Sequence, residues 1–374
     1  MSDFILGGDA AMLFSKLKGK RFLVTGHTGF KGAWLVAWLR ELGATVSGIA
    51  LDPLPGRGVF KDILNSDDLK DDIRQDMRHA RDFDGAIKLV DPEIVFHLAA
   101  QPLVLKSYSD PVETFETNVM GTTYLLESLR KVRNLQGLIC ITTDKVYENK
   151  ESPNGYVETD QLGGYDPYSA SKAACEVVIA SYARSFFNKE KIPIIAVRAG
   201  NVIGGGDWAD NRIVPDFFRA VESRQTLEMR SPSSVRPWQH VMEPLSGYLT
   251  VADAILTGKI REYEAYNFGP KKDAQVPVAQ IVDGLNAARA ASDTGQKVAV
   301  RYVDPKHHET SLLWLNCEKA RANLGWQPRL DIGTTLKLTS EFYLENLAGA
   351  SKTTMRELMT SQIRGYMERM TTLD

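Results

Sequence analysis

The sequence predicts an α/β protein built on a doubly wound parallel sheet of the Rossmann type, with a second, smaller lobe of mixed α/β structure. Three observations predict this fold. Short apolar runs alternate with helical patterns through the first 200 residues, which is typical of a parallel sheet covered by helices. The runs are almost continuously apolar, as strands buried on both faces are. After residue 200, turn-rich segments become frequent.

Five apolar runs predict the strands in chain order: Arg21–Val24, Thr45–Leu51, Glu93–Ala99, Leu138–Thr143 and Pro193–Ala199. Helical patterns fill intervals between them: Lys31–Leu42, Val112–Lys131 and Tyr168–Phe187. This alternation predicts parallel strands connected by helices. A last segment, Lys352–Met370, mixes apolar and charged residues and predicts a helix packed on the surface.

Composition and charge disfavour several classes of protein. The chain has 374 residues, of which 43% are hydrophobic and 25% charged, and its net charge is -2. This balance offers no basic surface for a nucleic-acid backbone, so we expect no nucleic-acid partner. No apolar run approaches the roughly 18 residues that span a bilayer. Asp3 and Asp9 stand where a signal peptide needs basic residues. We therefore expect a cytoplasmic protein without a membrane partner.

The motif GHTGFKG follows the first predicted strand and precedes a helix. Its glycines, Gly26, Gly29 and Gly32, have a spacing that suits a dinucleotide. The first allows a tight turn, the second lets the backbone approach a pyrophosphate at the helix N-terminus, and the third lets the helix pack on the strand. Glycine-rich turns are common, so the motif needs support from its surroundings.

Asp52 closes the second predicted strand, about 20 residues after the start of the helix, where an acid that binds ribose is expected. A carboxylate at this position favours NAD over NADP, because it repels a 2′-phosphate. Arg57 lies close by and keeps NADP as an alternative. Asp52 is alternatively a turn residue before Pro53.

The motif YSASK places Tyr168 and Lys172 four residues apart on a predicted helix, so the two side chains share a face. A free tyrosine has a pKa near 10 and is a poor base at neutral pH. We expect the ammonium of Lys172 and the positive nicotinamide ring of NAD to favour the phenolate. Tyr168 then accepts a proton from a sugar hydroxyl. After a nucleotide-binding fold, this interpretation is favoured over a tyrosine and a lysine on a helix surface.

The stretch TTDKVY follows the apolar run LICI and places Asp144 and Lys145 at the end of a buried strand. One interpretation is a polar turn that ends the strand. The other is an acid and a base directed at one small molecule.

Several motifs together resemble a known family. GHTGFKG, HLAAQP, TNVMGT and YSASK resemble the extended short-chain dehydrogenases/reductases, also called NAD-dependent epimerases/dehydratases. Longer pieces, among them TTDKVYEN, LGGYDPYSASK, RAGNVIGGGDWADNR and RPWQHVMEPLSGYL, resemble the CDP-glucose 4,6-dehydratases within that group. The resemblance runs from about residue 18 to beyond residue 328.

This resemblance implies the domains and the reaction. Residues 1–200 are expected to form mainly the NAD-binding Rossmann domain, and residues 201–374 mainly the sugar-nucleotide lobe, with some segments returning to the first domain. The implied reaction converts CDP-D-glucose to CDP-4-keto-6-deoxy-D-glucose and water through bound NAD, in deoxysugar and O-antigen synthesis. Relatives pair helices of the nucleotide domain, which implies a homodimer or homotetramer.

The resemblance also implies catalytic roles for the residues at the end of this strand and for the tyrosine–lysine pair. Tyr168, held with Lys172 beside the nicotinamide ribose, deprotonates the 4-hydroxyl, and Thr143 bonds the same hydroxyl. Asp144 is the acid for the departing 6-hydroxyl, and Lys145 is the candidate base at carbon 5. A lysine must be neutral to take a proton, so Lys145 alternatively stays charged and stabilises the enolate.

Binding residues are implied in the same way. The expected cofactor contacts come from glycine-motif, strand-end and catalytic residues: Gly26, Thr28, Gly29, Phe30, Gly32, Asp52, Asp72, Ile73, Leu98, Ala99, Ala100, Tyr168 and Lys172. The expected substrate contacts are Asn201, Arg212, Arg236 and His308, because arginine forks match a diphosphate. The adjacent His307 and His308 point apart and lack a cysteine or carboxylate cluster, so no metal is expected. His97 and Asn118 are expected to be structural.

Two other functions compete with this one. A nucleotide-sugar 4-epimerase also needs Tyr168, Lys172 and NAD, but it has no use for an acid such as Asp144. An NAD-binding regulator would have kept the fold without the chemistry, yet fold alone does not require the tyrosine–lysine pair. A dehydratase of another nucleotide hexose also stays open, because no local motif specifies cytosine.

Overall fold

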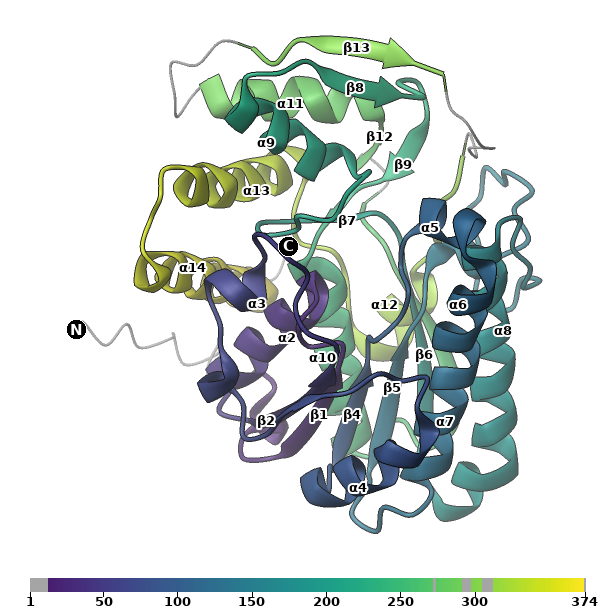
Figure 1. The fold of residues 1–374 in the computed structure, drawn as a ribbon. Coiled ribbons are helices and arrows are strands. Elements are labelled where there is room, and N and C mark those ends of the chain that lie inside the picture. The colour runs from purple at the N-terminus through teal and green to yellow at the C-terminus, as the bar shows by residue number, and fades with distance from the viewer. Residues whose placement is uncertain (1–12, 272–273, 291–296, 305–311, 373–374) are drawn as a thin grey trace.

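A seven-stranded parallel sheet forms the centre of the protein. The computed structural model describes residues 13–271, 274–290, 297–304 and 312–372. The strand order is β11-β6-β5-β4-β1-β2-β3, and each neighbouring pair is parallel (Figure 1). The strands are β1 (Arg21–Thr25), β2 (Thr45–Ala50), β3 (Asp72–Arg74), β4 (Ile94–His97), β5 (Gly137–Ile141), β6 (Ile194–Ala199) and β11 (Glu264–Phe268). The predicted fold class is confirmed.

Helices cover both faces of this sheet because alternate strand residues point to opposite sides. In β1, Phe22 and Val24 belong to one apolar core, and Leu23 belongs to the other. The first core joins the sheet to α2 (Phe30–Glu41), α10 (Met242–Leu256) and α14 (Lys352–Thr371). The second joins it to α4 (Ala80–Val90), α7 (Gly121–Leu129) and α8 (Pro167–Tyr182). Burial on both faces explains the nearly unbroken apolar strands.

A smaller lobe lies beyond the carboxyl ends of the strands, at the top of Figure 1. It contains three two-stranded pairings: β10 with β7, β12 with β9, and β13 with β8. Their strands are β7 (Val202–Ile203), β8 (Leu227–Arg230), β9 (Val235–Pro237), β10 (Gln239–His240), β12 (Gln275–Pro277) and β13 (Val300–Val303). The helices α9 (Ile213–Ser223), α11 (Val278–Ala290) and α13 (Ile332–Leu347) share a separate apolar core with them.

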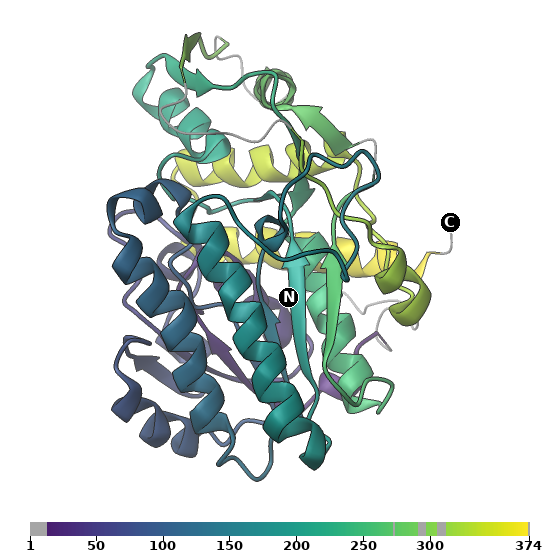
Figure 2. The ribbon, with the colours of Figure 1, turned by 90° about the vertical axis from the view of Figure 1, so that its right-hand side faces the viewer.

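The later part of the chain also contributes to the sheet layer. The edge strand β11 pairs with β6, and α10 packs on the first apolar core. The short helix α12 (Glu318–Leu324) contacts β11. The last helix, α14, lies across the sheet domain in both views (Figures 1 and 2). The division at residue 200 therefore follows the sequence order more closely than the spatial arrangement.

Two predicted helices are interrupted in the structure. The expected helix over Val112–Lys131 consists of α6 (Pro111–Phe115), a π-helical turn (Glu116–Met120) and α7. The extra residue of a π turn points Asn118 inward, where it bonds the backbone of Gln101 and Ser171 Oγ. The expected helix over Tyr168–Phe187 is α8 followed by another π turn over Ala183–Phe187. The short strand β3 was not predicted.

Two shorter helical segments complete the description of the sheet domain: α3 (Val59–Asp62) and α5 (Val104–Ser109). Across the described ranges, no helix combines the length and the apolar character needed to cross a membrane.

Candidate active site

Most of the predicted site residues gather where the carboxyl ends of β1, β4, β5 and β6 face the smaller lobe, and three cofactor residues lie after β2 or on β3. This is the edge at which open parallel sheets bind ligands. Lys31 of α2 lies close to several of these site residues, because its pKa is shifted by the charges of four residues: Lys172, Arg212, Asp144 and Asp207. These residues come from both lobes and are far apart in the sequence.

The glycine motif forms the turn between β1 and α2. Gly26 has a φ of +73°, and a Cβ there would lie 2.7 Å from the backbone nitrogen of Ala99. A Cβ on Gly32 would lie 2.2 Å from the carbonyl oxygen of Gly26. At Gly29, by contrast, the nearest atom would be that same oxygen at 3.4 Å. Gly26 and Gly32 therefore allow the turn to close, whereas Gly29 leaves the space before α2 open.

The open space lies at a helix start whose N-cap residue, Gly29, has no side chain to cap it. Gly29 is the N-cap of α2 and makes no side-chain capping bond, and Phe30 is the first helical residue. The first N–H groups of a helix lack partners inside it and favour an anion. The hydroxyl of Thr28 donates to the carbonyl oxygen of Leu51 at 3.0 Å and ties the turn to the end of β2. The donor set fits a dinucleotide pyrophosphate.

Asp52 follows β2 with an 86% exposed side chain, and its Oδ1 lies 3.4 Å from Nε of Arg74. It therefore remains accessible to a ribose hydroxyl. Arg57, the residue that kept NADP open, pairs with Glu222 of the smaller lobe at 2.9 Å. That carboxylate would compete with a 2′-phosphate for the same cation.

Asp72 and Ile73 lie on the edge strand β3. The carboxylate of Asp72 is held by the protein itself: Oδ1 lies 2.9 Å from His27 Nε2, and Oδ2 accepts from Arg74 at 2.7 Å. Burial lowers the pKa of His27, and Asp72 opposes that effect. Asp72 thus joins the glycine turn to β3, and Ile73 beside it is partly buried.

The turn after β4 contains Leu98, Ala99 and Ala100, next to the glycine turn. Thr25 Oγ1 accepts from the backbone nitrogen of Ala99 at 3.2 Å. His97 is buried, and its ring nitrogens lie 2.7 Å from Thr25 Oγ1 and 2.9 Å from Thr122 Oγ1. Burial lowers the pKa of His97 to about 3. His97 is therefore a neutral core residue, as expected.

Tyr168 and Lys172 lie on the first turns of α8, which Asp166 caps. Lys172 Nζ donates to the carbonyl oxygen of Ile141 at 2.9 Å, which ties α8 to the end of β5. Burial raises the pKa of Tyr168 to about 12, and a hydrogen bond with Thr143 lowers it by a smaller amount. Desolvation therefore outweighs the hydrogen bond with Thr143 and the charge of Arg212, which both lower this pKa.

The stretch TTDKVY turns sharply after β5 into the 3₁₀ turn Asp144–Val146. Thr143 Oγ1 donates to Asp144 Oδ1 at 3.0 Å. Asp144 is 2% exposed, and its Oδ2 has no hydrogen-bond partner among the residues that the structure describes. Burial raises the pKa of this carboxyl although Lys145, Arg236 and Lys31 act in the opposite direction. A buried carboxyl with a raised pKa is suited to donate a proton.

Lys145 follows Asp144 and is half-buried, so it can face a ligand bound beside that carboxyl. Lys31 is a further cation of the site that the sequence reasoning missed. Burial lowers its pKa to about 8, and Lys172 and Arg212 add to the effect. The motif GHTGFKG could have predicted it, since its lysine falls on the first turn of the helix that faces the nucleotide.

The expected substrate residues lie on the smaller lobe and its connection to β6. Arg212 is the N-cap of α9, and its Nη1 pairs with Asp207 Oδ2 at 2.7 Å. Arg236 lies on β9 and is close enough to lower the pKa of Asp144. The carbonyl oxygen of Asn201 accepts from the backbone of Gln239 at 3.0 Å. His308 lies outside the described residues.

Solved structures of known proteins share this fold. UDP-glucose 4-epimerase of Thermus thermophilus, crystallised with NAD, aligns with a TM-score of 0.74 and 24% identity over 87% of this chain and 99% of its own. dTDP-glucose 4,6-dehydratase of Bacillus anthracis, in complex with NAD, aligns with a TM-score of 0.70 and 21% identity over 87% and 96%. Fold, glycine turn and the Tyr168–Lys172 pair together define the class of NAD-dependent epimerases/dehydratases.

Sequence comparison narrows this class. The family model described as GDP-mannose 4,6 dehydratase matches residues 23–339, and the chain belongs to that family. CDP-glucose 4,6-dehydratase of Salmonella typhimurium is 45% identical over 325 residues, which are 85% of this chain and 89% of that protein. The family resemblance expected from the motifs is confirmed.

Proposed function

We propose that the protein is a CDP-glucose 4,6-dehydratase, which converts CDP-D-glucose to CDP-4-keto-6-deoxy-D-glucose and water. The observation that carries the proposal is Asp144, a buried carboxyl with a raised pKa, whose Oδ2 has no hydrogen-bond partner within the described ranges. It lies beside Tyr168, whose pKa it raises. The 45% identical relative, named CDP-glucose 4,6-dehydratase, supports the choice of nucleotide.

NAD is the cofactor that the donor set fits. The uncapped start of α2 and the space left by Gly29 would hold its pyrophosphate, and Asp52 would bind its ribose. When bound, NAD supplies reversible oxidation of the sugar, so that the overall reaction needs no second substrate. The Leu98–Ala100 turn would form the neighbouring wall.

Tyr168 begins the reaction by taking the proton of the sugar 4-hydroxyl. Because burial holds its pKa at about 12, the protein alone keeps this phenol neutral at physiological pH. The hydrogen bond with Thr143 and the charge of Arg212 favour the phenolate, and the positive cofactor ring adds to them. Lys172, fixed on the carbonyl oxygen of Ile141, would hold the ribose in line.

Asp144 acts after carbon 4 has become a ketone, which acidifies the proton at carbon 5. Its protonated carboxyl gives a proton to the 6-hydroxyl, and that oxygen leaves as water. Lys145 faces the same region and either removes the carbon-5 proton or stabilises the enolate with its charge. The first alternative needs a neutral amine and the second a charged one, and in both the order of the two residues along the 3₁₀ turn places Lys145 next to the acid.

The substrate diphosphate would lie between the lobes. Arg212 and Arg236 supply guanidinium groups that match phosphate oxygens, and Asn201 adds an amide donor. Arg212 already pairs with Asp207, which holds it in place before the substrate arrives. His308 is proposed as a further contact on the resemblance alone.

The test is incubation of the purified protein with CDP-glucose and, separately, with UDP-glucose, dTDP-glucose and GDP-mannose. Mass spectrometry should show loss of one water from CDP-glucose. An unchanged mass with a galactose epimer would select the epimerase and contradict the dehydratase. Cofactor binding without any change of the four sugars would favour the regulator.

We also propose that the protein is a homodimer. The outer face of α6, α8 and the turns beside them exposes apolar side chains: Val112, Phe115, Met120, Val177 and Phe186. Exposed apolar groups on neighbouring helices suit a second copy of the same face. Sedimentation should give a dimer, and Val177→Asp should shift it toward monomer; a monomeric parent protein would contradict the proposal.

A further inference from the structure

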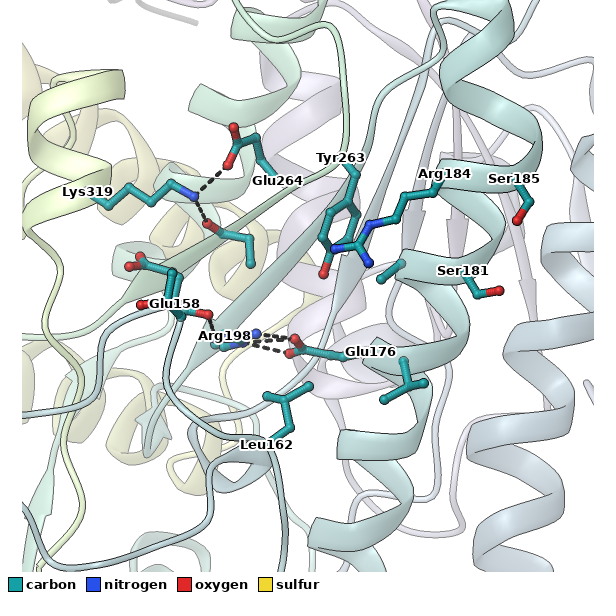
Figure 3. Close-up of a pocket in the computed structure, with 14 residues that line it drawn as sticks. Glu158, Leu162, Glu176, Ser181, Arg184, Ser185, Arg198, Tyr263, Glu264 and Lys319 are labelled. Atoms are coloured by element: carbon teal, nitrogen blue, oxygen red, sulfur yellow. Dashed lines mark hydrogen bonds and ion pairs between the residues drawn. The ribbon is translucent and has the colours of Figure 1, made fainter.

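A buried ion pair lies directly behind the strand end that bears Asp144. Glu176 of α8 and Arg198 of β6 are 1% and 2% exposed. Arg198 Nε donates to Glu176 Oε1 at 2.8 Å and to Oε2 at 3.0 Å, and Nη2 also donates to Oε2. Figure 3 shows the two side chains facing each other among the residues that line a cavity of about 740 Å³.

The pair is bonded to both flanks of the acid. Thr142, two residues before Asp144, donates its hydroxyl to Glu176 Oε1 at 2.6 Å. Tyr147, three residues after Asp144, accepts through its hydroxyl from Arg198 Nη1 at 2.6 Å. The stretch TTDKVY is therefore attached at its first and last residues to one ion pair.

The same pair belongs to the helix that carries the base. Glu176 lies one helical turn after Lys172 and two turns after Tyr168, so all three share a face of α8. Lys172 bonds the carbonyl oxygen of Ile141 at 2.9 Å, immediately before Thr142. The segment that carries the acid Asp144 and the helix that carries the base Tyr168 are thus both connected to the Glu176–Arg198 ion pair.

Further partners make this frame rigid. Tyr147 donates to Asn267 Oδ1 of β11 at 2.8 Å, and the guanidinium of Arg198 lies over its ring at 4.7 Å. The carbonyl oxygen of Glu158 accepts from Arg198 Nη1 at 3.1 Å. Lys319 and Glu264 form a separate ion pair in the cavity, so its charges balance each other instead of presenting one sign to a ligand.

We propose that Glu176 and Arg198 are positioning residues for the dehydration, holding Thr142 and Tyr147 so that Asp144 stays aligned with Tyr168. This inference rests on the proposed function. Neither residue touches the substrate; both act through the segment that they fix. A buried ion pair is costly to desolvate and is poor support for stability as such. A geometric role accounts for its place between the two halves of the catalytic machinery.

The test removes the two links and leaves the ion pair in place. Thr142→Val with Tyr147→Phe deletes both hydroxyls and keeps the side-chain shapes. Thr142→Ser keeps a hydroxyl and is the conservative rescue. Thr339→Val is the matched control, because this buried threonine also bonds through its hydroxyl, to the carbonyl oxygen of Thr335, but lies on α13. All variants are assayed below their melting temperatures.

We expect the double variant to catalyse water loss from CDP-glucose at least roughly tenfold more slowly than the wild type, because small misplacements of a reacting group are costly. The KM of the double variant should stay within about threefold of the wild-type value, since the substrate contacts are intact. The single variant Thr142→Ser, which keeps Tyr147, should retain most of the wild-type kcat. Wild-type kcat in the double variant, or a loss equal to that of Thr339→Val, would overturn the proposal.

A second measurement does not depend on the reaction. Amide hydrogen exchange of residues 142–147 should speed up in the double variant and stay unchanged in Thr339→Val. Unchanged exchange overturns the positioning role even if CDP-glucose is the substrate. If the parent protein leaves CDP-glucose intact, the proposed function fails on that result alone, and faster exchange still shows that the hydroxyls of Thr142 and Tyr147 hold the segment.

Discussion

Asp144 is acidic enough to ionise in water, yet its surroundings favour the protonated form. Burial raises its pKa, and the cations Lys145, Arg236 and Lys31 reduce that effect without reversing it. Thr143 occupies Oδ1. Oδ2 has no hydrogen-bond partner among the described residues, so it is the oxygen that we propose to carry the proton for the sugar 6-hydroxyl.

This protonation predicts a pH dependence. A general acid works only in its protonated form, so water loss should slow as the pH rises through the folded-state pKa of Asp144. That limb should lie above the usual range of an aspartate, because the pKa is raised. The rate of water loss in single turnovers across pH measures it. A limb that persists in Asp144→Asn would assign it to another group.

Tyr168→Phe should remove the base without removing the fold. The ring remains and only the hydroxyl is lost, so we expect CDP-glucose to bind while turnover falls roughly 10²- to 10⁴-fold. Tyr302→Phe is the control, since that tyrosine is 66% exposed on β13 of the smaller lobe. Equal turnover in the two variants would show that Tyr168 is not the base.

For single residues, the sequence predicts which ones belong to the site better than it predicts their pKa values and contacts. The motifs predict Tyr168, Lys172 and Asp144 as site residues, and their catalytic roles stay predictions. The raised pKa of Tyr168 could not be predicted, because it depends on how much water the folded lobes exclude. The bond from Thr142 to Glu176 joins residues 34 positions apart, and no local pattern announces it.

Among the secondary-structure elements, the turn into α2 separates two kinds of glycine. Gly26→Ala places a Cβ 2.7 Å from backbone at a φ of +73°, so we expect a destabilised fold, by about 1–3 kcal/mol. Gly29→Ala meets only one atom, at 3.4 Å, and should fold normally but weaken NAD binding. Thermal melting and calorimetric NAD titration measure both effects. Normal NAD affinity in Gly29→Ala would contradict the proposed pyrophosphate position.

The C-terminal helix α14 is attached through a buried carboxylate on α10. Glu243 accepts from the backbone nitrogens of Arg329 and Leu330 at 2.8 and 2.6 Å, and from Tyr366 of α14 at 2.6 Å. Burial nevertheless raises its pKa from 4.5 to about 7. The folded state therefore binds this proton more tightly than the unfolded state does.

That shift predicts how stability changes with pH. The contribution is fully present below about pH 4.5 and is lost as the pH rises toward 7, and a shift of this size corresponds to about 3 kcal/mol. Glu243→Gln should flatten the fall of Tm between pH 5 and 8. An unchanged slope in that variant would show that Glu243 is not the group responsible.

The elements themselves were predictable where their pattern is local. Continuous apolar runs predict five strands of the sheet. The helix predicted over Lys352–Met370 is α14 in the structure. The π turn at Glu116–Met120 was missed because it depends on the inward bonds of Asn118. The strand β3 was missed because it has only three residues.

In the whole molecule, the proposed catalytic residues and the two arginines proposed to bind the substrate lie on different lobes. The sheet domain carries Tyr168, Lys172 and Asp144, and the smaller lobe supplies Arg212 and Arg236. Contacts such as Arg57 with Glu222 and Trp34 Nε1 with the carbonyl oxygen of Gly205 join the two parts. The sequence predicts both lobes and the return of some later segments to the first domain, but that these segments are β11 and α10 follows only from long-range pairing.

The central claim is that one site oxidises a sugar and then eliminates water from it, with Asp144 serving only the second step. The most direct test mixes excess Asp144→Asn protein and NAD with CDP-glucose, quenches the mixture, and measures the sugar nucleotide by mass spectrometry. We predict a species that has lost two hydrogens but no water, which Tyr168→Phe should not form. Water loss at the wild-type rate in Asp144→Asn would contradict it.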